Sequence, residues 1–293
     1  MQVFITGGTG LIGSAVMPEL ISGGHSVVAL ARSDASAATA ESLGATVVRG
    51  DLTDLDAIRT ASSDADGVIH LAFGNDFSSP EALVQNIAEE TAAIDTIVDA
   101  LAGSDRPFVV VSGTPSAQGR PSVETDPLPT VGPVGGRAVT VNRALAAASR
   151  GIRTAAVRLP RTVHKDGQGG FAGLLTNIAR QRGAVAYPGT GEQRWPAVHA
   201  LDAAALFRLV LENAEPGTAW HAVQDEGDTV RSIAEVIGRR LGLPVQQAPI
   251  EVFGPIGPVF AADQPSSAAH TRAALGWEPT HARLLEDLEL LEP

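Results

Sequence analysis

Gln2-Val3-Phe4-Ile5-Thr6 is an apolar, β-forming run, and Gly7-Gly8-Thr9-Gly10-Leu11-Ile12-Gly13 follows it directly. The run predicts a buried strand, the glycines predict a tight turn, and the apolar spacing beyond them predicts a helix. Gly7 permits the turn, Gly10 lets the backbone approach a phosphate, and Gly13 lets the helix pack on the strand. Such a turn favours dinucleotide binding over an ordinary strand-to-helix connection. The expected contacts are Gly7, Thr9, Gly10, Leu11, Ile12 and Gly13.

Composition narrows the class of protein. The chain has 293 residues, a net charge of −12 and no cysteine, which excludes disulfides, thiol catalysis and thiolate metal sites. The negative charge disfavours nucleic acid and anionic membranes as partners. No apolar run is long enough to cross a bilayer, and no signal-peptide pattern precedes the first strand. We therefore expect a cytoplasmic protein.

Apolar strands alternate with helical patterns through the first half of the chain. The expected strands are 2–6, 26–31, 45–49, 66–71, 107–112 and 153–159. The expected helices lie near 11–22, 34–43, 54–61, 81–102 and 136–150. This alternation predicts a doubly wound parallel sheet of the α/β class.

The pattern changes near residue 160. Gly- and Pro-rich loops are expected at 166–173, 186–196 and 253–258, helices near 171–182, 201–213 and 230–241, and strands near 219–223 and 245–250. We expect a dinucleotide-binding domain over 1–160 and a smaller α/β lobe over 161–293, partly interleaved with the first. Ligands of such sheets bind beyond the carboxyl ends of the strands.

The end of the second expected strand bears on the choice of dinucleotide. A site for NAD wants a carboxylate there, which would accept hydrogen bonds from the adenosine ribose. This chain has Arg32 and Ser33, which can donate to a 2′-phosphate, whereas Asp34 is expected to cap the next helix. The sequence thus favours NADP(H) over NAD(H). The alternative is that Arg32 is a solvated loop charge that binds no phosphate.

Two further strand ends supply expected cofactor contacts. Asp51 and Leu52 follow the third strand and suit an adenine, although Asp51 could instead cap a helix. Leu71, Ala72 and Phe73 follow the fourth strand, where small residues let the backbone pass close to a cofactor.

Seven short motifs, distributed over essentially the whole chain, resemble those of one known family and occur in the same order as in that family. They are Thr6-Gly7-Gly8-Thr9-Gly10-Leu11-Ile12-Gly13, Gly50-Asp51-Leu52, His70-Leu71-Ala72, Val109-Val110-Val111-Ser112-Gly113-Thr114, Val157-Arg158-Leu159-Pro160, Val198-His199-Ala200-Leu201-Asp202 and Leu275-Gly276-Trp277-Glu278-Pro279. Through them the chain resembles the extended short-chain dehydrogenase/reductases, which include epimerases, dehydratases and reductases. The resemblance implies a Rossmann lobe, a C-terminal substrate lobe and a Ser/Thr–Tyr–Lys catalytic set.

The usual tyrosine and lysine of that set are missing. The single tyrosine, Tyr187, lies beyond the Rossmann strands and has Gly191 four residues later. Alignment on the preceding helix puts the tyrosine position near Pro133 and the lysine position near Arg137. Arg137 can keep a ribose or phosphate contact, but a guanidinium does not release a proton near neutral pH.

Three other residues are candidates for the chemistry. Thr114 has the Ser/Thr position and could polarise a carbonyl, or its hydroxyl could bond its own backbone. His164 is a candidate proton donor or an ordinary loop histidine, and Asp76 is a candidate acid or a turn residue. Arg161 and Lys165 flank His164 and could bind an anionic substrate or be solvated.

Other polar residues are expected to be structural. Trp195 and His199 would line or support the substrate lobe, His199 through a buried hydrogen bond, and Asp202 would cap a helix. No ligand spacing predicts a metal site.

The sequence therefore predicts an NADP(H)-dependent oxidoreductase that acts on a small organic carbonyl or alcohol. A non-catalytic NADP(H) sensor and a non-redox lyase or isomerase are the alternatives. The helices near 81–102 and 136–150 could pair two subunits into a homodimer, or they could simply cover the sheet.

Overall fold

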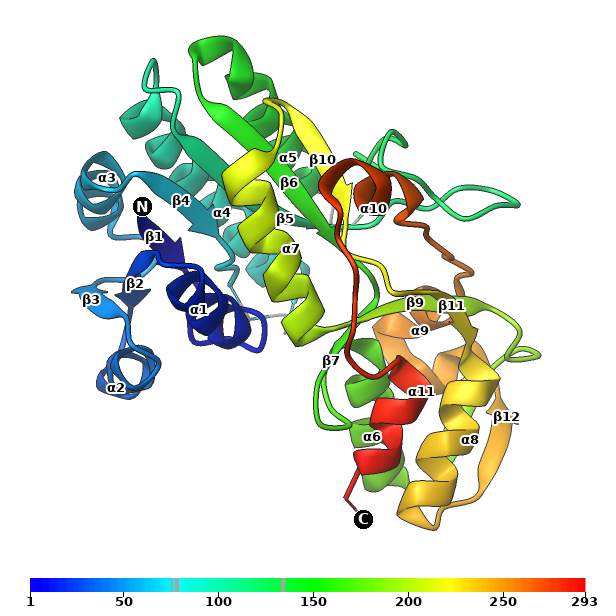
Figure 1. Ribbon diagram of the computed structural model, residues 1–293. Helices are drawn as coiled ribbons and strands as arrows, with labels where there is room; N and C mark the ends of the chain where they lie inside the picture. The colour runs from blue at the N-terminus through cyan, green and yellow to red at the C-terminus, as the bar shows by residue number, and fades with distance from the viewer. Residues whose placement is uncertain (75, 77–78, 133–134, 293) are drawn as a thin grey trace. The chain divides into compact units, whose positions relative to one another are not determined.

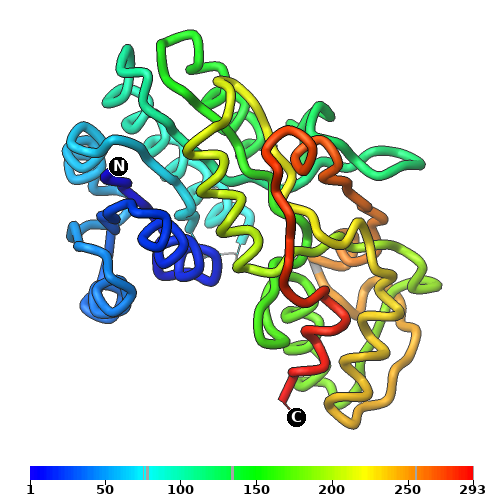
Figure 2. The backbone as a smooth tube through the Cα atoms, in the orientation of Figure 1, coloured from blue at the N-terminus to red at the C-terminus, as the bar shows by residue number. Residues whose placement is uncertain are grey.

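The structure is a computed structural model that describes residues 1–74, 76, 79–132 and 135–292. The chain forms two compact units, and each unit is assembled from three separate segments (Figure 2). Unit 1 comprises Met1–Ser112, Leu128–Arg158 and Ala204–Trp220, and unit 2 comprises Gly113–Pro127, Leu159–Ala203 and His221–Pro293.

A seven-stranded sheet in the order β10-β6-β5-β4-β1-β2-β3 forms the centre of unit 1. Its strands are β1 (Gln2–Thr6), β2 (Ser26–Ala31), β3 (Thr46–Arg49), β4 (Gly67–His70), β5 (Pro107–Gly113), β6 (Arg153–Leu159) and β10 (Thr218–His221). β1 pairs in parallel with both β2 and β4, so the strand order reverses between β1 and β4. This arrangement confirms the expected doubly wound sheet and places its switch point beside the glycine turn.

Helices cover both faces of this sheet (Figure 1). They are α1 (Gly13–Ser22), α2 (Asp34–Ser42), α3 (Leu55–Asp64), α4 (Pro80–Leu101), α5 (Gly135–Ala146), the 3-10 turn η1 (Ala147–Arg150) and α7 (Ala200–Asn213). One core cluster joins α3, α4 and α5 to Phe4 and Phe108 of the strands. α1 and α7 lie on the other face, where Leu211 packs against Gly67 of β4.

Unit 2 contains two small sheets, β11-β9-β7 and β12-β8. The strands are β7 (Thr162–His164), β8 (Val185–Pro188), β9 (Arg194–His199), β11 (Asp225–Thr229) and β12 (Val245–Ala248). The helices are α6 (Gly170–Arg182), α8 (Val230–Leu241), η2 (Ile250–Ile256), α9 (Gly257–Ala261), α10 (Ala269–Leu275), α11 (Leu284–Asp287) and η3 (Leu288–Leu290). Trp195 is fully buried in the core of this unit, with Phe171 and Phe260 packed edge-on against it.

Two segments that we expected to be loops are largely regular. Residues 186–196 contain the end of β8 and the start of β9, and residues 253–258 belong to η2 and α9. β9 pairs with β7 and β11, and β8 pairs with β12, which is about 60 residues away in sequence. Such long-range pairing stabilises strands whose own sequences are rich in glycine and proline. The strand expected near 219–223 is β10, which does return to the large sheet as predicted.

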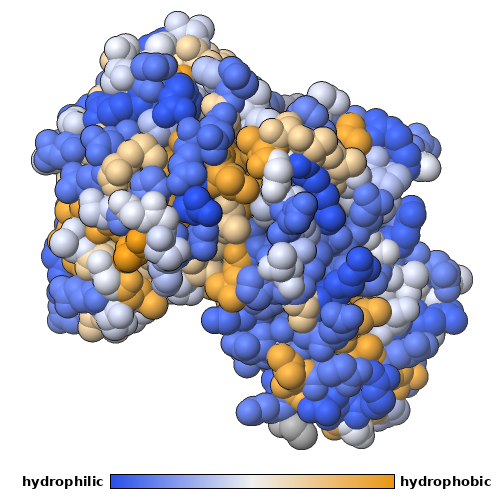
Figure 3. All heavy atoms as spheres, viewed as in Figure 1, coloured by the Kyte–Doolittle hydropathy of each residue, from blue (hydrophilic) through white to orange (hydrophobic). Residues whose placement is uncertain are grey.

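Among the described residues, none of the helices has the length and hydropathy needed to cross a bilayer. The face shown in Figure 3 is largely hydrophilic, with apolar side chains in small groups. Such a surface is consistent with the strong negative charge of the chain.

Candidate functional site

A groove of about 560 Å³ lies at the carboxyl ends of β1, β2, β3 and β4 in unit 1. Nine of its lining residues are expected cofactor contacts: Gly7, Thr9, Gly10, Arg32, Asp51, Leu52, Leu71, Ala72 and Phe73. The others are Leu30, Ser36, Gly50, Thr53, Gly74 and Glu89. The folding of the sheet therefore gathers four separate sequence motifs around one groove, at the switch point between β1 and β4.

Close backbone packing fixes the glycine turn at one side of this groove. Gly7 has a φ of +71°, and a Cβ there would lie 2.7 Å from the amide nitrogen of Ala72. A Cβ on Gly13 would lie 2.3 Å from the carbonyl oxygen of Gly7. A Cβ on Gly10 would meet only that same oxygen, at 3.6 Å, so the Gly10 position is open. α1 begins beyond Ile12 without a side-chain cap, which leaves its first turn suited to an anion.

Leu11, Ile12 and Gly13 do not line the groove themselves. Leu11 is exposed, Ile12 is the N-cap position of α1, and Gly13 is buried against Gly8. Their contribution is the placement of the helix.

Arg32 is exposed at the end of β2 and lines the groove together with Ser36. Ser33 does not line it, and its hydroxyl caps α2 in a reciprocal box with Ser36. The expected cap, Asp34, is instead the first helical residue and forms an ion pair with Arg49. No carboxylate from the β2–α2 connection therefore lines the described groove.

Asp51 forms a tight local turn within the groove wall. Its Oδ1 accepts hydrogen bonds from the Thr53 backbone N–H at 2.8 Å and the Thr53 hydroxyl at 2.6 Å. These bonds, the hydroxyl first, hold the pKa of Asp51 below its usual range, and the charge of Arg32 adds to the effect. Asp54, not Asp51, caps the following helix α3.

Arg137 is engaged within unit 1 and does not line the groove. Its guanidinium donates to both carboxylate oxygens of Glu90, with a shortest distance of 2.7 Å, and lies 4.1 Å from the ring centroid of Phe73. Glu90 is almost fully buried, and burial raises its pKa against the opposing effect of Arg137. Arg137 thus stabilises the buried Glu90 and backs Phe73, whose ring lines the groove.

Thr114 follows β5 and lies in the first segment of unit 2, which starts at Gly113. Its N–H donates to the carbonyl of Leu159 at 2.9 Å, and its carbonyl accepts from the Gln264 side chain at 2.6 Å. The side-chain hydroxyl is buried and has no hydrogen-bond partner among the described residues. The alternative in which this hydroxyl bonds its own backbone is therefore wrong. A buried hydroxyl without a partner is costly unless a ligand or water pairs with it.

His164 lies fully buried in unit 2, in β7. Its Nδ1 is 2.9 Å from Oδ2 of Asp287, a carboxylate oxygen that also accepts the N–H of Gly167. The Nε2 atom is buried without a hydrogen-bond partner among the residues described. The imidazole is fully buried and its Nδ1 is held by Asp287, so direct proton donation by His164 is not supported.

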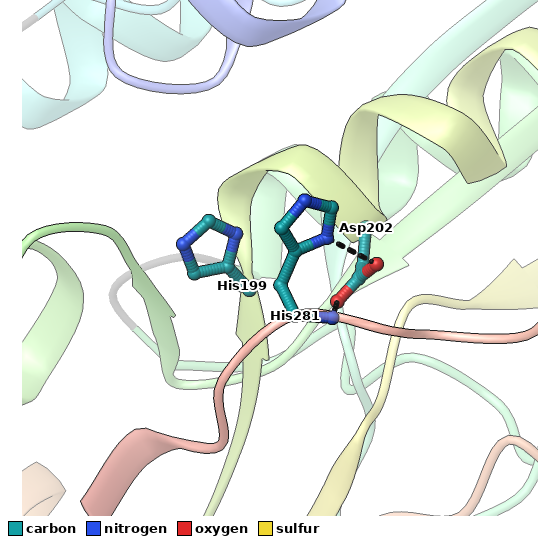
Figure 4. A group of neighbouring side chains, drawn as sticks. All are labelled: His199, Asp202 and His281. Carbon is teal, nitrogen blue, oxygen red and sulfur yellow. Dashed lines mark hydrogen bonds and ion pairs between the residues drawn. The ribbon is translucent and has the colours of Figure 1, made fainter. Parts of the chain in front are cut away.

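A second polar group in unit 2 consists of His199, Asp202 and His281 (Figure 4). The His199 and His281 rings stack with centroids 4.8 Å apart, and His281 Nδ1 lies 2.8 Å from Asp202 Oδ1. Asp202 also accepts the backbone N–H groups of Thr280 and His281, so it anchors that segment instead of capping its own helix. His199 is buried and accepts from the Leu201 N–H, and burial, with His164 and His281, lowers its pKa.

One ligand atom from each of these three residues lies within 4.8 Å of the others. At this spacing the three atoms could bind one metal ion. The carboxylate of Asp202, however, already accepts three N–H donors. A metal would have to displace them, and the hydrogen-bonded arrangement explains the geometry without one.

A sequence model of the NAD dependent epimerase/dehydratase family matches residues 3–223 of the chain. The chain belongs to this family. An uncharacterized protein of Saccharomyces cerevisiae is 41% identical and covers 98% of both chains. A 2-alkyl-3-oxoalkanoate reductase of Stenotrophomonas maltophilia is 28% identical over 75% of this chain and 68% of its own.

Among solved structures, a UDP-glucose 4-epimerase from Stenotrophomonas maltophilia shares the fold with a TM-score of 0.79 and 20% identity. The match covers 99% of this chain and 96% of that one, and that structure holds NAD and formylated UDP-arabinopyranose. At this level of identity the likeness concerns the fold alone.

This member of the epimerase/dehydratase family has its tyrosine in the small sheet of unit 2. Tyr187 lies in β8, with the guanidinium of Arg231 5.5 Å from its ring centroid. Pro133, at the expected tyrosine position, lies outside the described residues. Asp76 is exposed, its carbonyl accepts the Asn86 side chain, and it does not line the groove.

Sequence reasoning missed several groove residues. Gly50 belongs to a motif that was found but was not named as a contact, Thr53 follows that motif, and Ser36 lies one helical turn beyond Arg32. Glu89 has no such signal, because which face of the long helix α4 reaches the groove depends on how that helix packs.

Proposed function

We propose that the chain is an NADP(H)-dependent oxidoreductase that acts on a small carbonyl or alcohol substrate. The observation that carries this proposal is Arg32, a cationic side chain that lines the groove at the end of β2. A guanidinium there can form charge-assisted hydrogen bonds to a 2′-phosphate. Asp34, the acidic residue closest to Arg32 in the sequence, forms an ion pair with Arg49 and is not among the described residues that line the groove.

The rest of the described groove fits a dinucleotide. The open position at Gly10 and the uncapped first turn of α1 suit a pyrophosphate, and Leu30 and Leu52 offer apolar surface for an adenine. The two acidic side chains that line it, Asp51 and Glu89, can accept hydrogen bonds from sugar or base. Asp51 is ionised at neutral pH, since its hydrogen bonds lower its pKa.

When bound, NADPH supplies a hydride to the carbonyl carbon, and the carbonyl oxygen gains a proton. From its place at the family's Ser/Thr position, and not from any contact with the groove, we infer that the Thr114 hydroxyl donates a hydrogen bond to that oxygen; it has no partner among the described residues. We assign the proton itself to water, because the imidazole of His164 is held by the buried Asp287 and the chain has no tyrosine at the family's expected position. Thr114 thus orients and polarises the substrate.

The assignment of the cofactor is tested by Arg32→Asp. We expect the variant to raise the dissociation constant of NADPH by about 10- to 100-fold, the worth of a lost charge-assisted hydrogen bond, and to change that of NADH far less. Isothermal titration calorimetry with both nucleotides provides the measurement.

Arg59→Asp is the matched control, since Arg59 is exposed on α3 and the change in net charge is the same. Equal effects of Arg32→Asp on the two nucleotides, or an equal effect of the control on NADPH, would refute the assignment of the 2′-phosphate to Arg32.

A non-catalytic NADP(H) sensor is the second candidate. The engagement of Arg137 with Glu90 favours it, because the residue at the family's lysine position then holds a buried carboxylate. Tight NADPH binding without oxidation across a panel of aldehydes and ketones would support the sensor. Product formation without net cofactor turnover would instead support a lyase or isomerase.

A cytoplasmic location and a homodimer remain predictions from the sequence. α4 and α5 pack on one another, with the Thr91 and Thr140 hydroxyls 2.7 Å apart. They also leave Val84 and Val139 exposed, which is compatible with helix pairing between subunits.

A further inference from the structure

Arg161 has a partly buried guanidinium in unit 2, with no acceptor among the residues that the structure describes. It lies two residues beyond β6, and its backbone carbonyl accepts the N–H of Phe171 at 3.2 Å. The Nε atom is buried and has no hydrogen-bond partner, and the guanidinium makes neither an ion pair nor a hydrogen bond with any residue that the structure describes. The guanidinium instead lies over the ring of Phe171, whose centroid is 5.3 Å from Cζ.

Other partly buried arginines of this chain are paired. Arg137 donates to Glu90, and Arg208 donates to Glu19 and Glu212. Burial alone lowers the pKa of Arg161 to about 10, and no carboxylate opposes the effect. The side chain stays cationic at neutral pH, so the fold holds an uncompensated charge in a partly desolvated place. Such a charge reduces stability unless a ligand pairs with it.

A second unpaired donor belongs to Thr114, whose backbone pairs with the segment that leads to Arg161. The N–H of Thr114 donates to the carbonyl of Leu159, which is two residues before Arg161. The Thr114 hydroxyl is itself buried without a partner among the described residues. Thr114 and Arg161, both in unit 2, therefore each have a buried hydrogen-bonding group that nothing in the described chain satisfies.

We propose that Arg161 is the specificity residue for an anionic substrate, whose carboxylate or phosphate ester binds the guanidinium while Thr114 contacts the neighbouring oxygen. This inference rests on the proposed function, since Thr114 is there the group that polarises the carbonyl. The planar fork of a guanidinium matches carboxylate and phosphate oxygens in a bidentate manner. The Phe171 ring supports that fork from the side, as cation–π packing does.

The test is direct binding of two anions to the full chain, with and without NADPH. Succinate probes for a carboxylate site and inorganic phosphate for a phosphate site, each titrated calorimetrically. We expect at least one to bind with a stoichiometry of one, and Arg161→Gln to weaken that binding about tenfold or more. Arg161→Lys keeps the charge but loses the fork, so it should bind with intermediate affinity. Arg59→Gln is the matched control and should bind like the unchanged chain.

The preferred probe identifies the anion, and preference for either supports the inference. Absence of saturable binding of both probes, or unchanged binding by Arg161→Gln, overturns it. Arg161→Gln should also melt at or above the temperature of the unchanged chain in anion-free buffer, because an unpaired charge has been removed. If Arg161→Gln does not fold, the affinity of Arg161→Lys for the anion tests the inference instead. An unchanged affinity in Arg161→Lys would overturn the role of the guanidinium fork. A chain that binds the anion but not NADPH would refute the proposed function and leave the anion site standing.

Discussion

The imidazole of His70 is fully buried at the end of β4, with Nδ1 2.9 Å from the hydroxyl of Thr6. That hydroxyl also accepts the N–H of Ala72. Burial, and then the charge of Arg137, lower the pKa of His70 to about 3. The imidazole is therefore neutral in the folded chain, and it fixes the backbone from which Leu71 and Ala72 reach the groove.

This environment predicts a pH-dependent stability. An unfolded chain has an imidazole pKa near ~6.5, so between ~6.5 and the folded value only the unfolded state binds the proton. The contribution of His70 is complete above that range and is lost as the pH falls toward 3. We expect the free energy of unfolding to fall more steeply with acid than in His70→Asn, by up to about 1.4 kcal/mol per pH unit.

Urea denaturation at pH 7, 6, 5 and 4 measures both slopes. The variant loses packing as well as the titrating group, so the comparison concerns the slopes and not the absolute stabilities. Parallel slopes for the two proteins would show that His70 titrates normally in the folded chain.

Three arginines show how far residue type alone can be interpreted. Arg32 lines the groove, Arg137 neutralises buried Glu90, and Arg161 is partly buried without an acceptor. In the sequence each is a cation after a strand or on a helix. Their different surroundings come from residues distant in the chain, so only the fold distinguishes a ligand contact from a structural ion pair.

The position of α1 against the glycine turn depends on its first residue, Gly13. Gly13 has no room for a Cβ, which would lie 2.6 Å from Cα of Gly8 as well as 2.3 Å from the Gly7 oxygen. Because these are backbone atoms, the helix or the turn would have to move. We expect Gly13→Ala to lower the free energy of unfolding by about 1–3 kcal/mol, as overpacking does, and to weaken NADPH binding.

Gly173→Ala is the matched control for that substitution. Gly173 also lies in the first turn of a helix, α6, but the nearest atom to an added Cβ is 3.7 Å away. Alanine is the better helix former, so this variant should be more stable by about 0.5–1 kcal/mol. Urea denaturation of both variants gives the comparison, and a stable Gly13→Ala with full NADPH affinity would contradict the packing argument.

Elements with a strong local pattern were predictable, and those built by distant pairing were not. β1 (Gln2–Thr6), β2 (Ser26–Ala31) and α8 (Val230–Leu241) lie where the periodicity put them. β7 (Thr162–His164) and β9 (Arg194–His199) were not expected, since they depend on pairing with one another. A short strand next to glycine and proline carries too little local signal to be recognised alone.

For the whole molecule, the most consequential feature is that the chain returns to the large sheet after residue 200. Most of α7 and β10 lies in unit 1, and β10 is a strand of its sheet, although both elements come from the second half of the sequence. The side chains of α7 that are buried in unit 1 include Leu206, Phe207, Val210 and Leu211. The sheet therefore depends on residues outside the segment 1–160.

A fragment of residues 1–160 tests that dependence. We expect it to lack cooperative unfolding and to aggregate, because the removal of α7 exposes an apolar sheet face and the removal of β10 leaves β6 with an open edge. Thermal unfolding followed by circular dichroism is the measurement, with the full chain as the control. A monomeric fragment with a sharp transition would show that the segment 1–160 is an independent domain.

The sequence by itself determined the doubly wound sheet, the glycine turn and most of the residues around the groove. These features follow from local periodicity, from the conformations that glycine permits, and from the rule that the ends of parallel strands meet. The tertiary structure decided the burial of His164, the pairing of Arg137 with Glu90, and the unsatisfied groups of Arg161 and Thr114. Burial and hydrogen bonding depend on contacts between residues far apart in the chain, which no local pattern encodes.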